Sequence, residues 1–220
     1  MPVDCVVLVP MLGRAHRVRP LLESLHASTA DARALFICHH GDTAVLRAIG
    51  AEGAEHMMVN RVPIGDYARK INLGYRATTE PLIFLGASDL HFHPGWLEAC
   101  RAVLAPGVGV VGTNDLGSPR VMAGEHSTHS LVTREYADRY GTVDGPGQIY
   151  CEAYPHEYVD DELVGTAKHR DAWAFAFDAR VEHLHPNWHP EIPMDETYRG
   201  QQRRMLVGRR VFNRRRHRWT

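Results

Sequence analysis

The first half of the sequence alternates between short apolar runs and segments whose apolar residues recur at helical spacing. Five runs read as buried strands, at 6–10, 32–40, 56–60, 81–87 and 107–113. The segments between them, at 18–27, 43–51, 66–77 and 94–104, have the spacing, caps or early proline of helices. This alternation predicts an α/β fold in which helices cover both faces of a mostly parallel, Rossmann-like sheet.

The alternation ends after about residue 113. Residues 127–141 predict a strand that runs into a short helix, 156–171 a helix, and 172–186 one or two strands. The intervening stretch 143–155 is rich in glycine and proline and predicts a loop. We therefore expect one domain over 1–200, made of a larger half (1–115) and a smaller half (116–200), followed by a tail at 201–220.

The end of the chain is strongly basic. Residues 197–220 contain nine arginines and no acid, which leaves 16 basic and 26 acidic residues in the rest of the chain. Such an asymmetry favours a tail that binds an anionic partner, either nucleic acid or a membrane surface. The same charges also suit a tail that docks on the acidic body of its own chain, or one that is simply solvated.

Cysteine usage and hydropathy point to a cytoplasmic protein. The four cysteines are far apart and form no CxxC pair, as expected for reduced thiols. The apolar run near the N-terminus contains Asp4 and reads as a first strand rather than a signal peptide. No apolar stretch approaches the roughly 18 residues that span a bilayer.

Three polar loops follow predicted strands. They lie at Pro10–Arg14, His39–Asp42 and Ser88–His93. In a parallel sheet the carboxyl ends of strands meet at one edge, where ligands bind. We therefore expect a ligand site at this edge.

Asp89 and a pair of histidines are candidate metal ligands. Asp89 ends an apolar strand, and His183 and His185 alternate on one face of another. Carboxylate and imidazole groups suit Mn²⁺, and carboxylates suit Mg²⁺. Asp89 could instead cap a turn. A zinc site held by protein alone is disfavoured, because no further ligands occur at familiar spacing.

Three consecutive acids, Asp160, Asp161 and Glu162, offer a general base. Their crowding raises the cost of ionising all three, so one of them should have a raised pKa. The alternative is an acidic helix N-terminus that only complements the helix dipole.

Together these motifs resemble the GT-A-fold glycosyltransferases, in particular the large inverting family that includes cellulose-synthase-like and rhamnosyl transferases. The likeness spans roughly residues 3–190 and rests on VVLVPMLGRAHRVRPLLESL, KINLGYRA, PLIFLGASDLHFHPGWL, the acidic helix and a late histidine. The resemblance implies transfer of a sugar from a nucleotide diphosphate-sugar, with a UDP-sugar as the default donor and Mn²⁺ or Mg²⁺ as cofactor.

The resemblance also implies roles for individual residues. Asp89 matches the second aspartate of the family's Asp-x-Asp motif, whereas Ala87 stands where the first would be; His91 is a candidate to compensate. His183 or His185 would complete the metal site. Asp161 matches the catalytic base best and Asp160 second best. The donor-binding positions are Pro10, Leu12, Arg14, His39, Asp42, Lys70, Asn72 and Ser88, of which His39 replaces the family's base-binding aspartate.

The acceptor is open at this stage. Arginines mixed with aromatic residues in the tail favour DNA, for example a hydroxymethylated base of the kind that viral enzymes modify. Lipid-linked and protein acceptors are alternatives, as is a non-catalytic nucleic-acid-binding protein with the same body. A nucleotidyltransferase is disfavoured, because MLGRAHR contains only one glycine.

Overall fold

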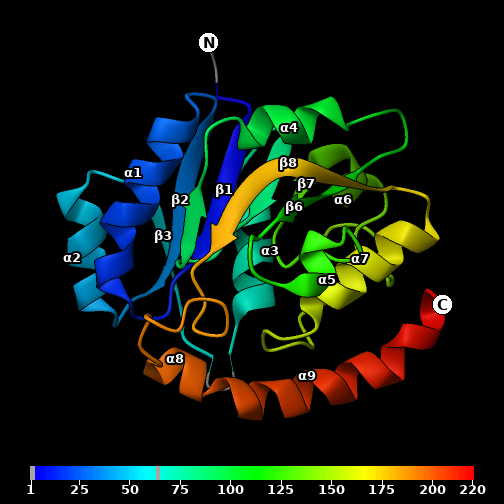
Figure 1. Ribbon diagram of the computed structural model, residues 1–220. Coiled ribbons are helices and arrows are strands. Elements are labelled where there is room, and N and C mark those ends of the chain that lie inside the picture. The colour runs from blue at the N-terminus through cyan, green and yellow to red at the C-terminus, as the bar shows by residue number, and fades with distance from the viewer. Residues whose placement is uncertain (1–2, 63–64) are drawn as a thin grey trace.

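Within residues 3–62 and 65–220, which a computed structural model describes, eight strands form one sheet in the order β3-β2-β1-β4-β7-β6-β8-β5 (Figure 1). The strands are β1 (Cys5–Pro10), β2 (Ala32–His39), β3 (His56–Val59), β4 (Leu82–Leu85), β5 (Leu90–Phe92), β6 (Val110–Asn114), β7 (Ser130–Thr133) and β8 (Trp173–His183). The helices are α1 (Val18–Ser28), α2 (Thr43–Ala51), α3 (Tyr67–Ala77), α4 (Trp96–Ala102), α5 (Pro119–Met122), α6 (Arg134–Arg139), α7 (Val159–His169), α8 (Glu196–Arg199) and α9 (Gln201–Arg215). Two short 3-10 turns, Ala15–Arg17 and Arg216–Arg218, complete the elements.

The strand pairing is mixed but mostly parallel. β1 pairs in parallel with both β2 and β4, and β2 with β3. β7 is antiparallel to β4 and β6, β8 is parallel to β6, and β5 is antiparallel to β8 at the edge. The predicted α/β sheet with helices on both faces is therefore confirmed.

Two apolar cores lie on opposite faces of the sheet, because successive side chains of a strand point to opposite sides. Val7 of β1 belongs to the core that also contains residues of α1, α2 and α4. Its neighbours Val6 and Leu8 belong to the core that contains residues of α3, α6 and α7. Gly74 lets α3 approach β1, since a Cβ there would lie 2.8 Å from a Leu8 methyl group.

The structure departs from the sequence expectations in the second half and at one edge. The predicted loop before 94 contains the edge strand β5. The single strand β8 within 172–186 agrees with the one or two strands expected there. The helix expected from residue 156 begins at Val159. β5 is only three residues long and exists because it pairs with β8, a partner distant in sequence.

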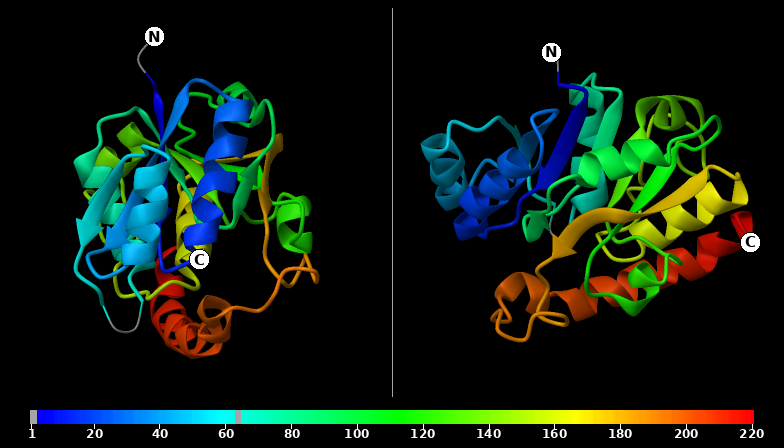
Figure 2. Two further views of the ribbon diagram at one scale, coloured as in Figure 1. Left: turned by 90° about the vertical axis from the view of Figure 1, so that its left-hand side faces the viewer. Right: turned by 45° about the horizontal axis from the view of Figure 1, so that its top comes forward.

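The basic tail forms α9, which lies along the body close to α7 (Figures 1 and 2). Arg215 binds both carboxylate oxygens of Glu162 at 2.7 Å, and Arg204 Nε lies 3.0 Å from Glu157 Oε1. Trp219 is buried beyond the end of α9. Gly208 permits the close approach, because a Cβ there would lie 2.4 Å from the Glu157 carbonyl oxygen. Part of the tail's charge is therefore used within the chain.

None of the helices in the described ranges has both the length and the apolar character needed to cross a membrane.

Candidate functional site

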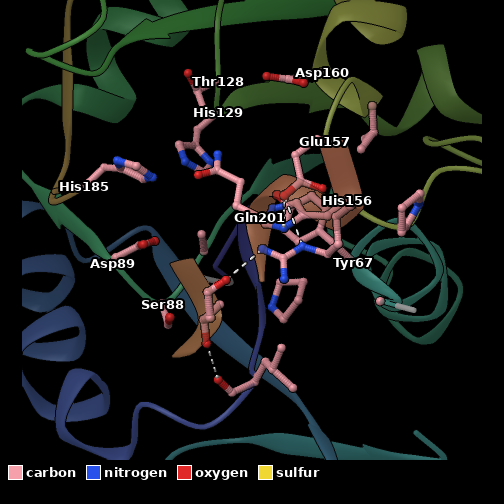
Figure 3. A pocket seen from close by; sticks show the side chains of 18 of the residues that line it. Tyr67, Ser88, Asp89, Thr128, His129, His156, Glu157, Asp160, His185 and Gln201 are labelled. Atoms are coloured by element: carbon pink, nitrogen blue, oxygen red, sulfur yellow. Dashed lines mark hydrogen bonds and ion pairs between the residues drawn. The ribbon is translucent and has the colours of Figure 1, made fainter. Parts of the chain in front are cut away.

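A cavity of about 410 Å³ opens at the carboxyl ends of β1 and β4. Its walls come from the loops after these strands, the segments before β7 and α7, the exit of β8, and the start of α9 (Figure 3). Segments from both halves of the chain therefore meet here. Ten of the thirteen residues named from the sequence as donor contacts, metal ligands or bases line this cavity. They are Pro10, Leu12, Arg14, Lys70, Ser88, Asp89, Asp160, Asp161, His183 and His185.

Asp89 lies at the floor of the cavity just before β5 and is 4% exposed. Its Oδ2 accepts hydrogen bonds from Arg14 Nη1 at 2.8 Å and from the Tyr198 hydroxyl at 2.7 Å, and lies 3.7 Å from His183 Nε2. Burial alone would raise the pKa of Asp89, but His183, Arg14 and Tyr198 hold that pKa well below its usual value. Asp89 is therefore an ionised carboxylate in a buried place.

Arg14 links this carboxylate to the C-terminal segment. Its Nε lies 2.6 Å from Asp195 Oδ2, and its guanidinium carbon lies 3.9 Å from the centre of the Tyr198 ring. Arg14 has a left-handed backbone conformation, φ 60°, at the turn after β1. Such a conformation is uncommon for a residue with a side chain and here turns Arg14 into the site.

Three histidines lie in the wall next to Asp89. The ring centroids of His129 and His183 are 5.0 Å apart, and those of His183 and His185 are 5.2 Å apart. Figure 3 shows His129, His185 and Asp89 around the same side of the cavity. Burial lowers the pKa of His129 to about 4 and that of His185 to about 4, and His183 adds to both shifts. Both rings are therefore neutral near pH 7.

Hydrogen bonds distinguish the two neutral rings. His129 Nδ1 lies 3.0 Å from the Leu85 carbonyl oxygen, which can only accept, so Nδ1 carries the proton. His185 Nδ1 accepts from the Asn187 backbone N–H at 3.1 Å, so its proton is on Nε2. A metal needs a bare ring nitrogen, and His129 offers one at Nε2 whereas His185 does not.

The two predicted bases stand across the cavity at the start of α7. Asp160 Oδ2 lies 3.1 Å from His126 Nε2, and Asp161 Oδ1 lies 3.4 Å from the exposed Arg120 guanidinium. Burial would raise the pKa of Asp160, but the hydrogen bond from His126 lowers it. Burial, and then the charge of Asp160, raise the pKa of Asp161. The adjacent carboxylates thus have opposite shifts, as is common for groups with distinct acid–base roles.

Three of the predicted donor contacts lie outside the cavity wall. His39 is buried and its Nε2 lies 2.8 Å from Asp66 Oδ2. Asp42 caps α2 and accepts a hydrogen bond from the Gly13 backbone N–H at 2.8 Å. Asn72 is fully buried and binds the backbone of Ile149 and Tyr150. Each of these polar groups is satisfied within the chain.

Lys70 does line the cavity, although its ammonium group is also bound by groups of the chain. Its ammonium donates to the Met11 carbonyl oxygen at 2.6 Å and lies 3.4 Å from Asp66 Oδ1. The side chain is 1% exposed. Lys70 therefore fixes the turn after β1 and places a positive charge behind the cavity.

The structure places residues in the site that the sequence did not mark as donor contacts, metal ligands or bases. His129, Asp195 and Tyr198 surround Asp89 from segments 40 to 109 positions away in the chain. Glu157, next to Arg204, also lines the cavity, and burial raises the pKa of this carboxyl group. No local pattern marks these residues, because their roles depend on long-range packing.

Comparison with solved structures identifies the fold. No protein-family model and no curated protein sequence matches this chain. A mannosyltransferase from Pyrobaculum calidifontis, solved with GDP-Man and Mn²⁺, matches with a TM-score of 0.66 at 15% identity, over 97% of this chain and 65% of that one. The chain thus spans about 65% of the length of that enzyme.

A second group of similar structures is the glucosyl-3-phosphoglycerate synthase of Mycobacterium tuberculosis. The complex with Mn²⁺, UDP-Glc and phosphoglyceric acid matches with a TM-score of 0.61 at 15% identity, over 93% of this chain and 78% of that one. The complex with Mg²⁺ and UDP matches at 0.60 and 17% identity, over 96% and 79%. The chain therefore has the fold of GT-A nucleotide-sugar glycosyltransferases, as the sequence motifs predicted.

Proposed function

We propose that this protein is a metal-dependent glycosyltransferase that moves a sugar, with inversion, from a nucleotide diphosphate-sugar to an acceptor hydroxyl. The observation that carries the proposal is one shared cavity. It joins Asp89 and His183 on one wall to Asp160 and Asp161 on the other. These residues are far apart in the chain, and their chemistry is what such a transfer needs at its two ends.

Each group in the cavity has a separate role in the proposed transfer. A bound divalent cation supplies Lewis-acid stabilisation of the leaving diphosphate. The carboxylate of Asp89 and the ring of His183 fit such an ion, because their oxygen and nitrogen atoms are ligands that Mn²⁺ accepts. Arg14 adds positive charge on the same wall. Asp161 removes the proton of the acceptor hydroxyl as its oxygen attacks the anomeric carbon on the face opposite the diphosphate.

We propose a UDP-sugar as donor, on the family resemblance and on the similarity to synthase structures that contain UDP or UDP-Glc. The similar mannosyltransferase contains GDP-Man, so GDP-sugars are the natural comparison. A cytoplasmic location is proposed because the four cysteines, all in the described part of the chain, are free thiols.

The first test is thermal unfolding with a panel of UDP- and GDP-sugars, with and without Mn²⁺. A ligand that binds only the folded protein at 100 times its Kd adds about 2.7 kcal/mol of stability. We expect one sugar nucleotide to raise Tm only when Mn²⁺ is present. The absence of any shift, together with tight DNA binding, would instead favour a non-catalytic nucleic-acid-binding protein.

Asp89→Ala should abolish the Mn²⁺-dependent part of that shift, because it removes the carboxylate nearest to His183. The control is Glu182→Gln, which changes a neighbouring carboxylate that pairs with His93 at 3.2 Å outside the cavity. The control should behave like the unmodified protein. Normal Mn²⁺-dependent donor binding by Asp89→Ala would remove Asp89 from the metal site.

For the acceptor, we propose DNA, for example a hydroxymethylated base, on the charge of the outward face of α9. Arg203, Arg210 and Arg214 are exposed there and make no ion pair within the described chain. Met205 and Leu206 are the exposed large apolar residues of this helix, and two such residues make a smaller apolar face than an interfacial membrane helix presents. Gln201, Arg204 and Met205, in the first turns of the same helix, line the cavity.

Replacing Arg203, Arg210 and Arg214 together with glutamine should weaken DNA binding and reduce the slope of log K against log salt by about 2–3, because each phosphate contact contributes about 0.7–0.9. The control replaces three exposed arginines on α1, α2 and α6, namely Arg19, Arg47 and Arg139. It removes the same charge from other faces. An equal slope in both variants would show only non-specific attraction and would favour a protein or lipid-linked acceptor.

A further inference from the structure

His129 has the features of a metal ligand and has no assigned role in the proposed reaction. It precedes β7, is 5% exposed and lines the cavity. Its Nε2 is buried and has no hydrogen-bond partner within the described chain. A buried acceptor without a hydrogen-bond partner destabilises the folded protein. A chain that retains such an atom in a cavity wall offers it to a ligand.

The opposite side of the ring is arranged as in known metal sites. His129 Nδ1–H donates to the Leu85 carbonyl oxygen at 3.0 Å. Metal-binding histidines commonly donate their second ring N–H to a carbonyl or carboxylate, which fixes the tautomer and the ring orientation. The bond to Leu85 therefore leaves the lone pair of Nε2 available.

The position of the ring matters as well. Leu85 ends β4, two residues before Ala87, so His129 is anchored beside the place where the Asp-x-Asp motif lacks its first carboxylate. The His129 ring also stands edge-on to His183, with centroids 5.0 Å apart. His183 Nε2 in turn lies 3.7 Å from Asp89. His129 thus adjoins both the vacant motif position and the two expected ligands.

We propose that His129 is a third protein ligand, so that Asp89, His183 and His129 form a nitrogen-rich metal site. This inference rests on the proposed function, which supplies the divalent metal ion. In the described part of the chain, the ligand atoms of these three residues do not all lie within 4.8 Å of one another. Because Asp89 Oδ2 and His183 Nε2 already lie 3.7 Å apart, metal binding requires His129 Nε2 and this pair to move closer together.

The donor set determines which metal binds. Two imidazoles and one carboxylate favour Mn²⁺ and later transition metals, whereas Mg²⁺ prefers oxygen ligands and water. We therefore expect Mn²⁺ to bind at least about tenfold more tightly than Mg²⁺. His185 is not part of the set, because its Nδ1 accepts from the Asn187 backbone and its Nε2 carries the proton.

The test is binding of Mn²⁺ alone to the full chain, measured by calorimetry and by pulsed EPR, which counts nitrogens coordinated to Mn²⁺. The variant is His129→Asn, whose side-chain N–H can still donate to Leu85 while the Nε2 ligand is lost. We expect two nitrogens in the unmodified protein and one in His129→Asn, with affinity about tenfold or more weaker. Unfolding without metal checks that the variant is folded.

His126→Asn is the matched control, because His126 with Asp160 and Asp161 forms the other candidate cation cluster beside the cavity. It should leave both nitrogens. One nitrogen in the unmodified protein, a count unchanged in His129→Asn, or no Mn²⁺ binding would overturn the proposal. Two nitrogens without any nucleotide-sugar binding would leave the metal site standing and remove the transferase function.

Discussion

Asp161→Asn should lower kcat for sugar transfer by about 100- to 10,000-fold, which is the usual contribution of a general base. Donor binding should persist, because Asp161 lies across the cavity from Asp89. Asparagine keeps the size of the side chain and can still accept a hydrogen bond from Arg120, which is 3.4 Å from the carboxylate. The measurements are kcat for transfer and the Mn²⁺-dependent thermal shift with the donor.

Asp160→Asn is the matched control, because the neighbouring carboxylate is held by His126 at 3.1 Å. We expect a smaller loss from it. If Asp160→Asn lost more activity than Asp161→Asn, the base would be Asp160.

The pH profile gives a second measure of the same role. A base must be ionised, and burial and Asp160 raise the pKa of Asp161 above its ordinary value of 3.8. The rate of transfer should therefore fall as the pH drops through that raised pKa, and Asp160→Asn should move the acidic limb to lower pH by removing a neighbouring negative charge. If the acidic limb did not move, the charge of Asp160 would not influence the pKa of the catalytic base.

The sequence was sufficient for the parts of the site that follow strands of the sheet. Asp89 follows β4 and Arg14 follows β1, and parallel pairing of β1 with β4 brings the ends of both strands to one edge. His39 shows the limit of that argument. It ends β2, which pairs with β1, yet its ring pairs with Asp66 and does not itself line the cavity. A strand end predicts the edge but not the direction of a side chain.

The residues around Asp89 could not be predicted, because no short pattern encodes them. Tyr198 lies on α8, a four-residue helix, and its hydroxyl binds Asp89. Asp195, the residue that caps α8, binds Arg14. α8 continues into α9, whose arginines bind acids near α7. The basic tail was therefore visible as charge in the sequence, whereas its contribution to the site depends on docking.

Asn72→Leu should reduce the free energy of unfolding by about 3 kcal/mol or more, because Asn72 makes four hydrogen bonds while fully buried. Its Oδ1 accepts from the backbone N–H groups of Ile149 and Tyr150, and its Nδ2 donates to the Tyr150 carbonyl oxygen. Leucine would leave these buried backbone groups unpaired. For a chain of this size the loss corresponds to a Tm lower by roughly 6–12 °C.

The result separates two roles for Asn72. The family resemblance places it near the donor diphosphate, whereas its hydrogen bonds hold the loop that carries Tyr150 into the cavity wall. Asn213→Leu, on the exposed side of α9, is the control for the substitution itself. A large loss of Tm in Asn72→Leu alone supports the structural role. An unchanged Tm with lost donor binding would instead place Asn72 at the diphosphate, since a contact to the ligand affects affinity without affecting the stability of the free protein.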